Sequence, residues 1–154
     1  MLGDVEMFDQ RVRMEIDETL PWREIRSQGF NGHIGPMRIA RASETTWQAA
    51  LLLDARHINF GGVCHGGVYM SFADVAMGAA ASETLGRKPC ATIDFNAHFM
   101  AAAKEGHTLI AHTALNRMVS GICFMECELW AGGRKCMRAS GIWKQLSDRP
   151  GPTG

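Results

Sequence analysis

Residues 57–86 constrain the fold of this chain more than any other part of the sequence. They begin with a polar loop rich in glycine and continue, over residues 68–82, as a run of apolar and small side chains. Asp74 is the one ionisable carboxyl group within that run. Burying a carboxylate among apolar neighbours costs free energy unless the group is paired. Asp74 is therefore the first candidate for a chemical role.

Size and charge indicate a single globular domain. The 154 residues fit one domain, and 46% of them are hydrophobic, which is enough for a sizeable core. Lysine plus arginine and aspartate plus glutamate number 16 each. The chain therefore lacks the net positive charge that is typical of general nucleic-acid binding.

Cysteine usage and the start of the sequence predict a cytoplasmic protein. The five cysteines are an odd number without a paired spacing, which indicates reduced thiols. The first residues carry acidic side chains where a signal peptide has a basic start and an apolar core. The run over 68–82 is too short for a membrane span, so we expect a buried helix there.

The hydrophobic pattern predicts an α+β domain over 1–146. An N-terminal segment over 1–35 is expected to hold a helix over 4–20 and a short second helix that begins at Pro21. Further along, we expect strands over 37–42 and 46–54, a long helix over 66–85, four strands over 90–100, 107–117, 121–130 and 135–146, and a disordered tail over 147–154.

Alternation within the strand over 90–100 assigns its side chains to two faces. Thr92, Asp94, Asn96 and His98 are predicted to share one of them.

A single apolar helix followed by antiparallel strands can be covered if the sheet wraps around it. One sheet does not cover all sides of such a helix, so one helix face would stay open. A second copy of the chain could cover that face, which predicts a dimer.

Two groups of the long helix could act on a carbonyl group. Gly66 begins the helix, where N–H groups lack intrahelical partners and stabilise developing negative charge. Asp74 lies ~12 Å further along the axis, too far for one helix to bring both groups to one atom. Either Asp74 serves a different site, or two antiparallel copies of the helix exchange partners across a dimer.

The residues of this loop and helix resemble the motif of the hot-dog-fold acyl-CoA thioesterases. The motif consists of Asn59, Gly61, His65-Gly66-Gly67 and then Asp74. The similarity is greatest to the branch that contains the phenylacetate-degradation thioesterases and the human thioesterase-superfamily proteins, and it covers about residues 35–146. It implies an antiparallel sheet wrapped around a central helix, and homodimers that often pair into tetramers.

The resemblance also implies roles in hydrolysing an acyl-CoA substrate to a free acid and coenzyme A, without a cofactor. The Gly66 N–H would polarise the thioester carbonyl, and Asp74 would act across the dimer as general base or nucleophile. Asn59 would bind the carbonyl or the water, His65 would shape the loop, and Thr92 would orient the water.

Several residues have alternative interpretations. Asn59 and His65 could only brace the loop, and Thr92 also suits a strand for its β-branched shape. Arg87 and Lys88 could meet the phosphates of coenzyme A or form a solvated pair.

The remaining cysteines, histidines and large apolar residues also allow more than one role. Cys64 next to His65 could form a nucleophilic pair, although adjacent residues on a turn seldom align for that. The cysteines and histidines of the later strands lack metal-ligand spacing. The acyl tunnel could be lined by Phe60, Met70, Met77, Phe95 and Phe99.

Two other functions fit the same sequence. A hot-dog hydratase or dehydratase would use His65 together with Asp74 on an acyl thioester. A binding module that senses acyl-CoA would leave Asp74 without a role.

Overall fold

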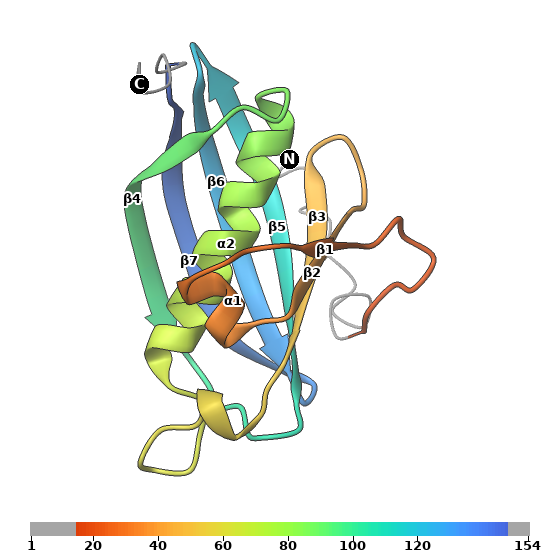
Figure 1. Cartoon of the computed structure of the whole chain (residues 1–154), viewed down its shortest axis with the longest axis vertical. Coiled ribbons are helices and arrows are strands. Elements are labelled where there is room, and N and C mark those ends of the chain that lie inside the picture. The colour runs from red at the N-terminus through yellow and green to blue at the C-terminus, as the bar shows by residue number, and fades with distance from the viewer. Residues whose placement is uncertain (1–14, 148–154) are drawn as a thin grey trace, which may run out of the picture.

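One long helix lies in the concave face of a seven-stranded antiparallel sheet in the computed structural model, which describes residues 15–147 (Figure 1). The order of the strands across the sheet is β1-β2-β3-β5-β6-β7-β4. The elements are β1 (Arg23–Ile25), α1 (Phe30–Ile34), β2 (Met37–Arg41), β3 (Thr46–Leu52), the 3₁₀-helix η1 (Ala55–His57), α2 (Gly66–Thr84), β4 (Cys90–Phe99), β5 (Thr108–Val119), β6 (Ile122–Ala131) and β7 (Arg134–Gln145).

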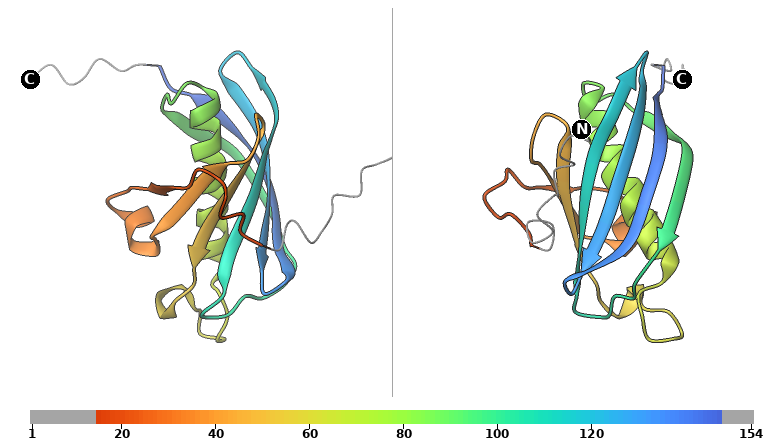
Figure 2. Two further views of the ribbon diagram at one scale, coloured as in Figure 1. Left: turned by 90° about the vertical axis from the view of Figure 1, so that its right-hand side faces the viewer. Right: turned by 180° about the vertical axis from the view of Figure 1, so that it is seen from behind.

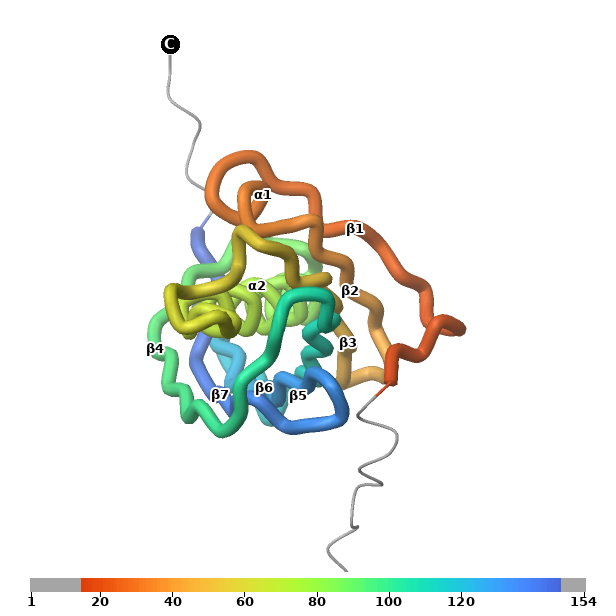
Figure 3. Tube along the Cα trace, turned by 90° about the horizontal axis from the view of Figure 1, so that it is seen from below, coloured from red at the N-terminus to blue at the C-terminus, as the bar shows by residue number. Residues whose placement is uncertain are grey.

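The long helix α2 is buried along one side only. Its buried side chains come in pairs that recur every four residues, which places them on one face of the helix. The sheet curves around this face, as the view along the helix shows (Figure 3). This is the predicted hot-dog arrangement. The buried residues are Val68, Tyr69, Phe72, Ala73, Ala76, Met77, Ala80 and Ala81.

Both ends of α2 follow from local sequence. His65 is the N-cap, and its ring nitrogen Nδ1 accepts the N–H of Gly67 at 2.8 Å. After the last turn, Gly86 takes a positive φ of 71°. Glycine reaches that conformation without steric cost, so it can end the helix there.

The N-terminal segment departs from the sequence-based prediction. Instead of a short helix after Pro21, residues 23–25 form β1, which pairs with β2 at the edge of the sheet. The unpaired N–H and C=O groups of an edge strand attract such an added strand, and this pairing outweighs the local helical pattern. The glycine-rich region beyond it forms the short helix α1.

Two other predictions concern the ends of the chain. Residues 15–20 are not helical, and the rest of the helix predicted over 4–20 lies outside the described residues. The predicted disordered tail over 147–154 also lies outside them, apart from Ser147.

Strand β4 is the edge that lies beside the open face of α2. It pairs with β7 on one side only. Seen from behind, the outer face of the strands β4 to β7 carries no helix of the described part of the chain (Figure 2). The open helix face and the free edge of β4 therefore meet on one side of the molecule.

Candidate active site

Gly66, Met70 and Asp74 lie along one stripe of α2. They recur every four residues, so their positions follow one another up the same side of the helix. None of the three is among the residues that α2 buries against the sheet. The candidate groups Gly66 and Asp74 therefore both lie toward the open face of α2.

The carboxylate of Asp74 is held by Thr92 from the neighbouring strand. The Thr92 hydroxyl donates to Asp74 Oδ1 at 2.7 Å, which joins β4 to the middle of α2. Among residues 15–147, the second oxygen, Oδ2, receives no hydrogen bond. The structure thus brings together these two candidates and leaves one carboxylate oxygen for a further partner.

This contact depends on a β-bulge in β4, which places Thr92 on a different face of the strand from the predicted one. The register between β4 and β7 shifts between Thr92 and Asp94, which inserts Ile93 as an extra residue. Thr92 is paired with Trp143 and Phe95 with Gly141, whereas Asp94 is paired with Ile142. Directly opposed residues share a face, and Trp143 is in the core. Thr92 therefore faces α2, and the prediction that it shares a face with Asp94 is wrong.

Gly141 makes room for the bulge. A Cβ atom at this position would lie 2.5 Å from the Asp94 carbonyl oxygen and 2.7 Å from the ring of Trp143. Neither neighbour can move freely, because one is backbone and the other is a buried side chain. An isolated glycine inside a predicted strand is a signal for such a bulge, and Gly141 is that signal in this sequence.

Replacing Gly141 with alanine is expected to lower the free energy of unfolding by about 2 kcal/mol, since overpacking typically costs 1–3 kcal/mol. The same change should displace Thr92 from Asp74. Chemical denaturation measures the first effect. Ser140 is the exposed neighbour of Gly141, and Ser140→Ala is the control, expected to stay within about 0.5 kcal/mol of the wild type. Equal stability of the two variants would show that the close contacts at Gly141 do not matter.

The first turn of α2 uses most of its N–H groups within the chain. The N–H of Gly67 is bound by the His65 ring, and those of Val68 and Tyr69 lie 2.9 and 3.4 Å from the His65 carbonyl oxygen. Gly66 supplies the first-turn N–H that none of these bonds uses. Because Nδ1 of His65 accepts a hydrogen bond, that nitrogen carries no proton.

Asn59 shapes the loop that precedes α2. Its side-chain oxygen Oδ1 accepts the N–H groups of Gly61 at 2.8 Å and Val63 at 3.3 Å. Its own N–H donates to the Val63 carbonyl at 2.7 Å. Phe60, at the tip of this loop, is fully exposed. Within one chain, Asn59 thus acts as a loop residue through its side-chain oxygen, and these bonds do not use its side-chain NH₂ group.

The apolar candidates for an acyl tunnel fall into two sets. Met77 is 0% exposed in the core, whereas Met70 and Phe99 are 42% and 52% exposed. The Phe99 ring packs beside Gly66, 3.4 Å from where a Cβ atom would stand, and stacks on Tyr69 with 6.1 Å between centroids. Phe99 therefore forms an exposed apolar wall beside Gly66 at the start of α2.

Arg87 and Lys88 lie beyond the other end of α2. Both are exposed, and the Lys88 carbonyl accepts the Ser82 hydroxyl at 2.9 Å. At ~1.5 Å per residue, the helix separates them from Gly66 by roughly 30 Å. Within one chain, the structure does not bring this pair to the other candidates.

The environment of Cys64 disfavours a cysteine nucleophile. The residue is buried, and burial, with a smaller contribution from Cys136, raises the pKa of its thiol to about 12. Such a thiol stays protonated at neutral pH, whereas the thiolate is the reactive form.

Metal and membrane sites are not found in the described part of the chain. Residues 15–147 contain no group of three or more histidine, cysteine, aspartate or glutamate side chains that could hold a metal ion. Over the same residues, no helix has both the length and the apolar character needed to cross a membrane.

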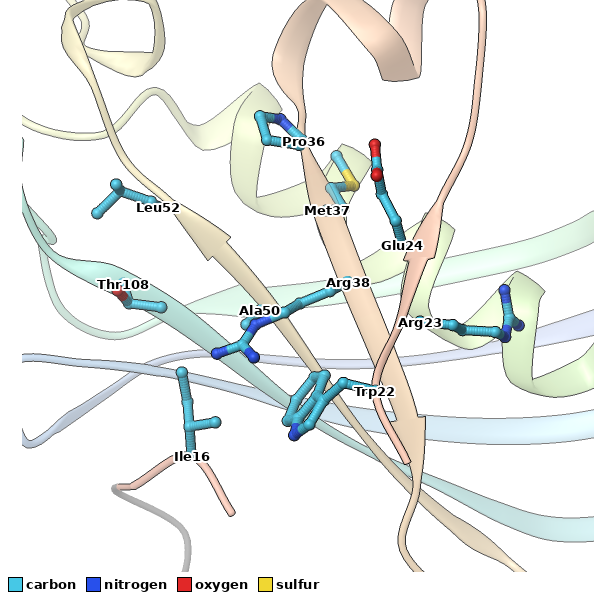
Figure 4. Close-up of a pocket in the computed structure, with 10 residues that line it drawn as sticks. All are labelled: Ile16, Trp22, Arg23, Glu24, Pro36, Met37, Arg38, Ala50, Leu52 and Thr108. Carbon is cyan, nitrogen blue, oxygen red and sulfur yellow. The ribbon is translucent and has the colours of Figure 1, made fainter. Parts of the chain in front are cut away.

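A pocket of about 440 Å³ lies away from the candidate residues (Figure 4). It is lined by residues of the segment before β1, of β1, β2 and β3, and of the start of β5, among them Trp22, Arg38 and Leu52. The Arg38 guanidinium lies 4.5 Å from the centre of the Trp22 ring and binds Glu18 at 2.8 Å. None of the predicted site residues lines this pocket.

Comparison with known proteins identifies the family. The family model of the thioesterase superfamily matches residues 61–137. A Pseudomonas aeruginosa protein named "Putative esterase PA0474" is 30% identical over 119 residues, which cover 77% of this chain and 89% of the relative. The chain belongs to the thioesterase superfamily. This membership and the name of the relative support thioester hydrolysis as the general activity.

Solved structures share the fold. A conserved Pseudomonas aeruginosa protein, PA5202, superposes with a TM-score of 0.70 at 22% identity and covers 78% of this chain and 95% of its own. Zebrafish thioesterase superfamily member 2 gives a TM-score of 0.70 at 21% identity, with 79% of this chain and 88% of its own covered. The PaaI protein of the Escherichia coli phenylacetic acid degradation operon gives 0.68 at 17% identity, with 76% and 83% covered.

Proposed function

We propose that the protein hydrolyses an acyl-CoA thioester to a free acid and coenzyme A at a site shared by two chains. The observation that carries this proposal is the contact between Thr92 and Asp74, which holds a carboxylate on the open face of α2. Gly66, with its unused N–H, lies on the same stripe of that helix.

A second copy of the chain is the proposed cover for the open face of α2. This face carries the apolar side chain of Met70, which is 42% exposed, whereas Val75 and Ala79 of the same helix are partly buried and pack against the core. Beside it, the edge strand β4 exposes Ile93, and Met100 follows at 52% exposure. Apolar surface next to an unpaired strand edge favours association with another chain. We infer a homodimer that pairs further into a tetramer, in the cytoplasm, where the five free thiols would stay reduced.

The proposed reaction uses water activated by Asp74. Its free oxygen Oδ2 would take a proton from water while the hydroxide attacks the thioester carbonyl carbon. The Gly66 N–H of the other chain would bind the carbonyl oxygen as it becomes negative. Collapse of the tetrahedral intermediate breaks the carbon–sulfur bond, and the proton passes from Asp74 to the coenzyme A sulfur.

The remaining candidates would support this chemistry. Thr92 keeps one oxygen of Asp74 occupied and so directs the other toward the water. The His65 ring keeps the first turn of α2 formed, and the amide group of Asn59 would bind the carbonyl or the water. Direct attack by Asp74 on the carbonyl carbon is the alternative route, and Arg87 with Lys88 of the second chain would meet the coenzyme A phosphates.

A cross-linking experiment tests the arrangement of the two helices. If Gly66 of each chain faces Asp74 of the other, the two-fold axis passes near the midpoint of the stripe, at Met70. A Met70→Cys variant is therefore expected to form a covalent dimer with a short bifunctional thiol reagent. Met118→Cys, exposed to 48% on β5, should not. Cross-linking of the second variant alone would contradict this arrangement.

The activity itself is tested by measuring thiol release from short, medium, long and aryl acyl-CoA substrates. Release of coenzyme A from at least one series is the expected result. Hydration of a crotonyl thioester without thiol release would instead identify a hydratase, and tight binding without turnover would identify a binding module.

A further inference from the structure

His57 is a buried histidine that the proposed mechanism does not use. Its side chain is 0% exposed, and both ring nitrogens have partners. Nδ1 accepts the N–H of Asp54 at 2.9 Å, and Nε2 lies 2.7 Å from the Ile34 carbonyl oxygen. An N–H group only donates and a carbonyl oxygen only accepts, so these two contacts fit a proton on Nε2. Nδ1 also lies 3.4 Å from the Asp54 carboxylate oxygen Oδ1.

The backbone of His57 closes the loop that carries Asn59. The His57 carbonyl accepts the N–H of His65 at 2.8 Å. Next to this bond, Ile58 and Cys64 form an isolated antiparallel bridge. The two ends of the loop between them therefore meet at the His57–His65 pair, which we call the root of the loop. Since His65 is the N-cap of α2, the position of the Gly66 N–H is set from this root.

The ring of His57 ties the same root to the end of α1. Arg56 donates to the carbonyl groups on either side of Ile34, those of His33 and Gly35, the latter at 2.8 Å. Three successive carbonyl groups are thus held by two neighbouring side chains. The Asp54 carboxylate accepts hydrogen bonds from the Arg56 side chain, at 2.8 Å, and from the Arg56 backbone N–H. These bonds to Arg56 lower the pKa of the Asp54 carboxyl group to about 2.

We propose that His57 is a positioning residue for the thioesterase site, which fixes the loop with Asn59 and the Gly66 N–H by clamping its root onto the carbonyl group of Ile34. This inference rests on the proposed function. In the proposed mechanism, the His57 ring does not touch the reacting atoms and acts through the loop. A bridge between a short helix and a catalytic loop has no signature in sequence, because its acceptor is a backbone carbonyl.

Two conservative variants separate the two ring contacts. Glutamine can place its amide N–H₂ where Nε2 stands, and so keep the bond to Ile34. Asparagine can place an oxygen where Nδ1 stands, but it is too short to reach Ile34. His57→Asn is expected to lower kcat for thiol release by roughly tenfold to a hundredfold, because small misplacements of reacting groups have effects of that order. His57→Gln should stay within about threefold of the wild type.

Hydrogen exchange provides a readout that does not depend on activity. In His57→Asn, the amides of residues 59–66 should exchange faster than in the wild type, whereas in His57→Gln they should not. Leu109→Ala, a core change in β5, controls for a general loss of stability. If Leu109→Ala accelerates exchange over 59–66 as much as His57→Asn does, or if the two His57 variants behave alike, the proposal is overturned. A wild type that releases no thiol would refute the proposed function, while the exchange comparison would still decide the role of His57.

Discussion

Asp74→Asn is expected to lower kcat for thiol release by roughly 10²–10⁴-fold, the range for loss of a general base. Asparagine keeps the size of the side chain and an oxygen that can accept the Thr92 hydroxyl, so the fold should be unchanged. It has no free carboxylate oxygen to take a proton from water. Steady-state assays, with circular dichroism and size-exclusion chromatography for fold and assembly, measure the effect.

The matched control for this experiment is Asp94→Asn, two residues beyond Thr92 on β4. Asp94 is exposed and accepts a hydrogen bond from Asn96 at 2.6 Å, but it lies on the face away from Asp74 because of the bulge. Its replacement should leave kcat within about twofold of the wild type. Wild-type turnover by Asp74→Asn would remove Asp74 from the mechanism.

Gly66→Pro is expected to lower kcat by roughly 10²–10³-fold, the effect of losing one oxyanion donor. Proline lacks the N–H group, and the first position of a helix is where it is best tolerated. The preceding residue, His65, already has φ −61° and ψ 133°, the extended conformation that a following proline requires. The change should therefore delete the donor without breaking α2.

Gly66→Ala separates the N–H group from the missing side chain. It keeps the donor, and its Cβ atom would make ordinary contacts of 3.4 and 3.6 Å with the Phe99 ring. Alanine should therefore retain most of the activity that proline removes. Equal losses in the two variants would indicate that space at Gly66, rather than its N–H, is what the reaction needs.

Most of the fold could be predicted because the strongest local patterns coincide with the final structure. The apolar run after His65 is buried as α2, and the alternating segments after Pro89 form four strands close to the predicted bounds. The segment after Pro21 could not be predicted, because its strand conformation depends on pairing with β2, which local sequence does not report.

The geometry around the proposed site residues could be predicted from the sequence only in part. Thr92 and Asp74 were proposed separately, and the structure joins them by a hydrogen bond that requires a bulge in β4. The sequence carries no signal for the role of His57, because its ring bonds to backbone groups, and one of them, the Ile34 carbonyl, lies 23 residues away. The distance along α2 between Gly66 and Asp74 remains the physical reason for expecting two chains in one site.

Mixing the two inactive variants tests that expectation most directly. Asp74→Asn and Gly66→Pro chains are dissociated, combined in equal amounts and reassociated. In a shared site, each mixed dimer pairs an intact Gly66 with an intact Asp74, so the mixture should regain about a quarter of wild-type activity, since half of the dimers are mixed and hold one intact site of two. A mixture as inactive as its two components would contradict a site built from two chains.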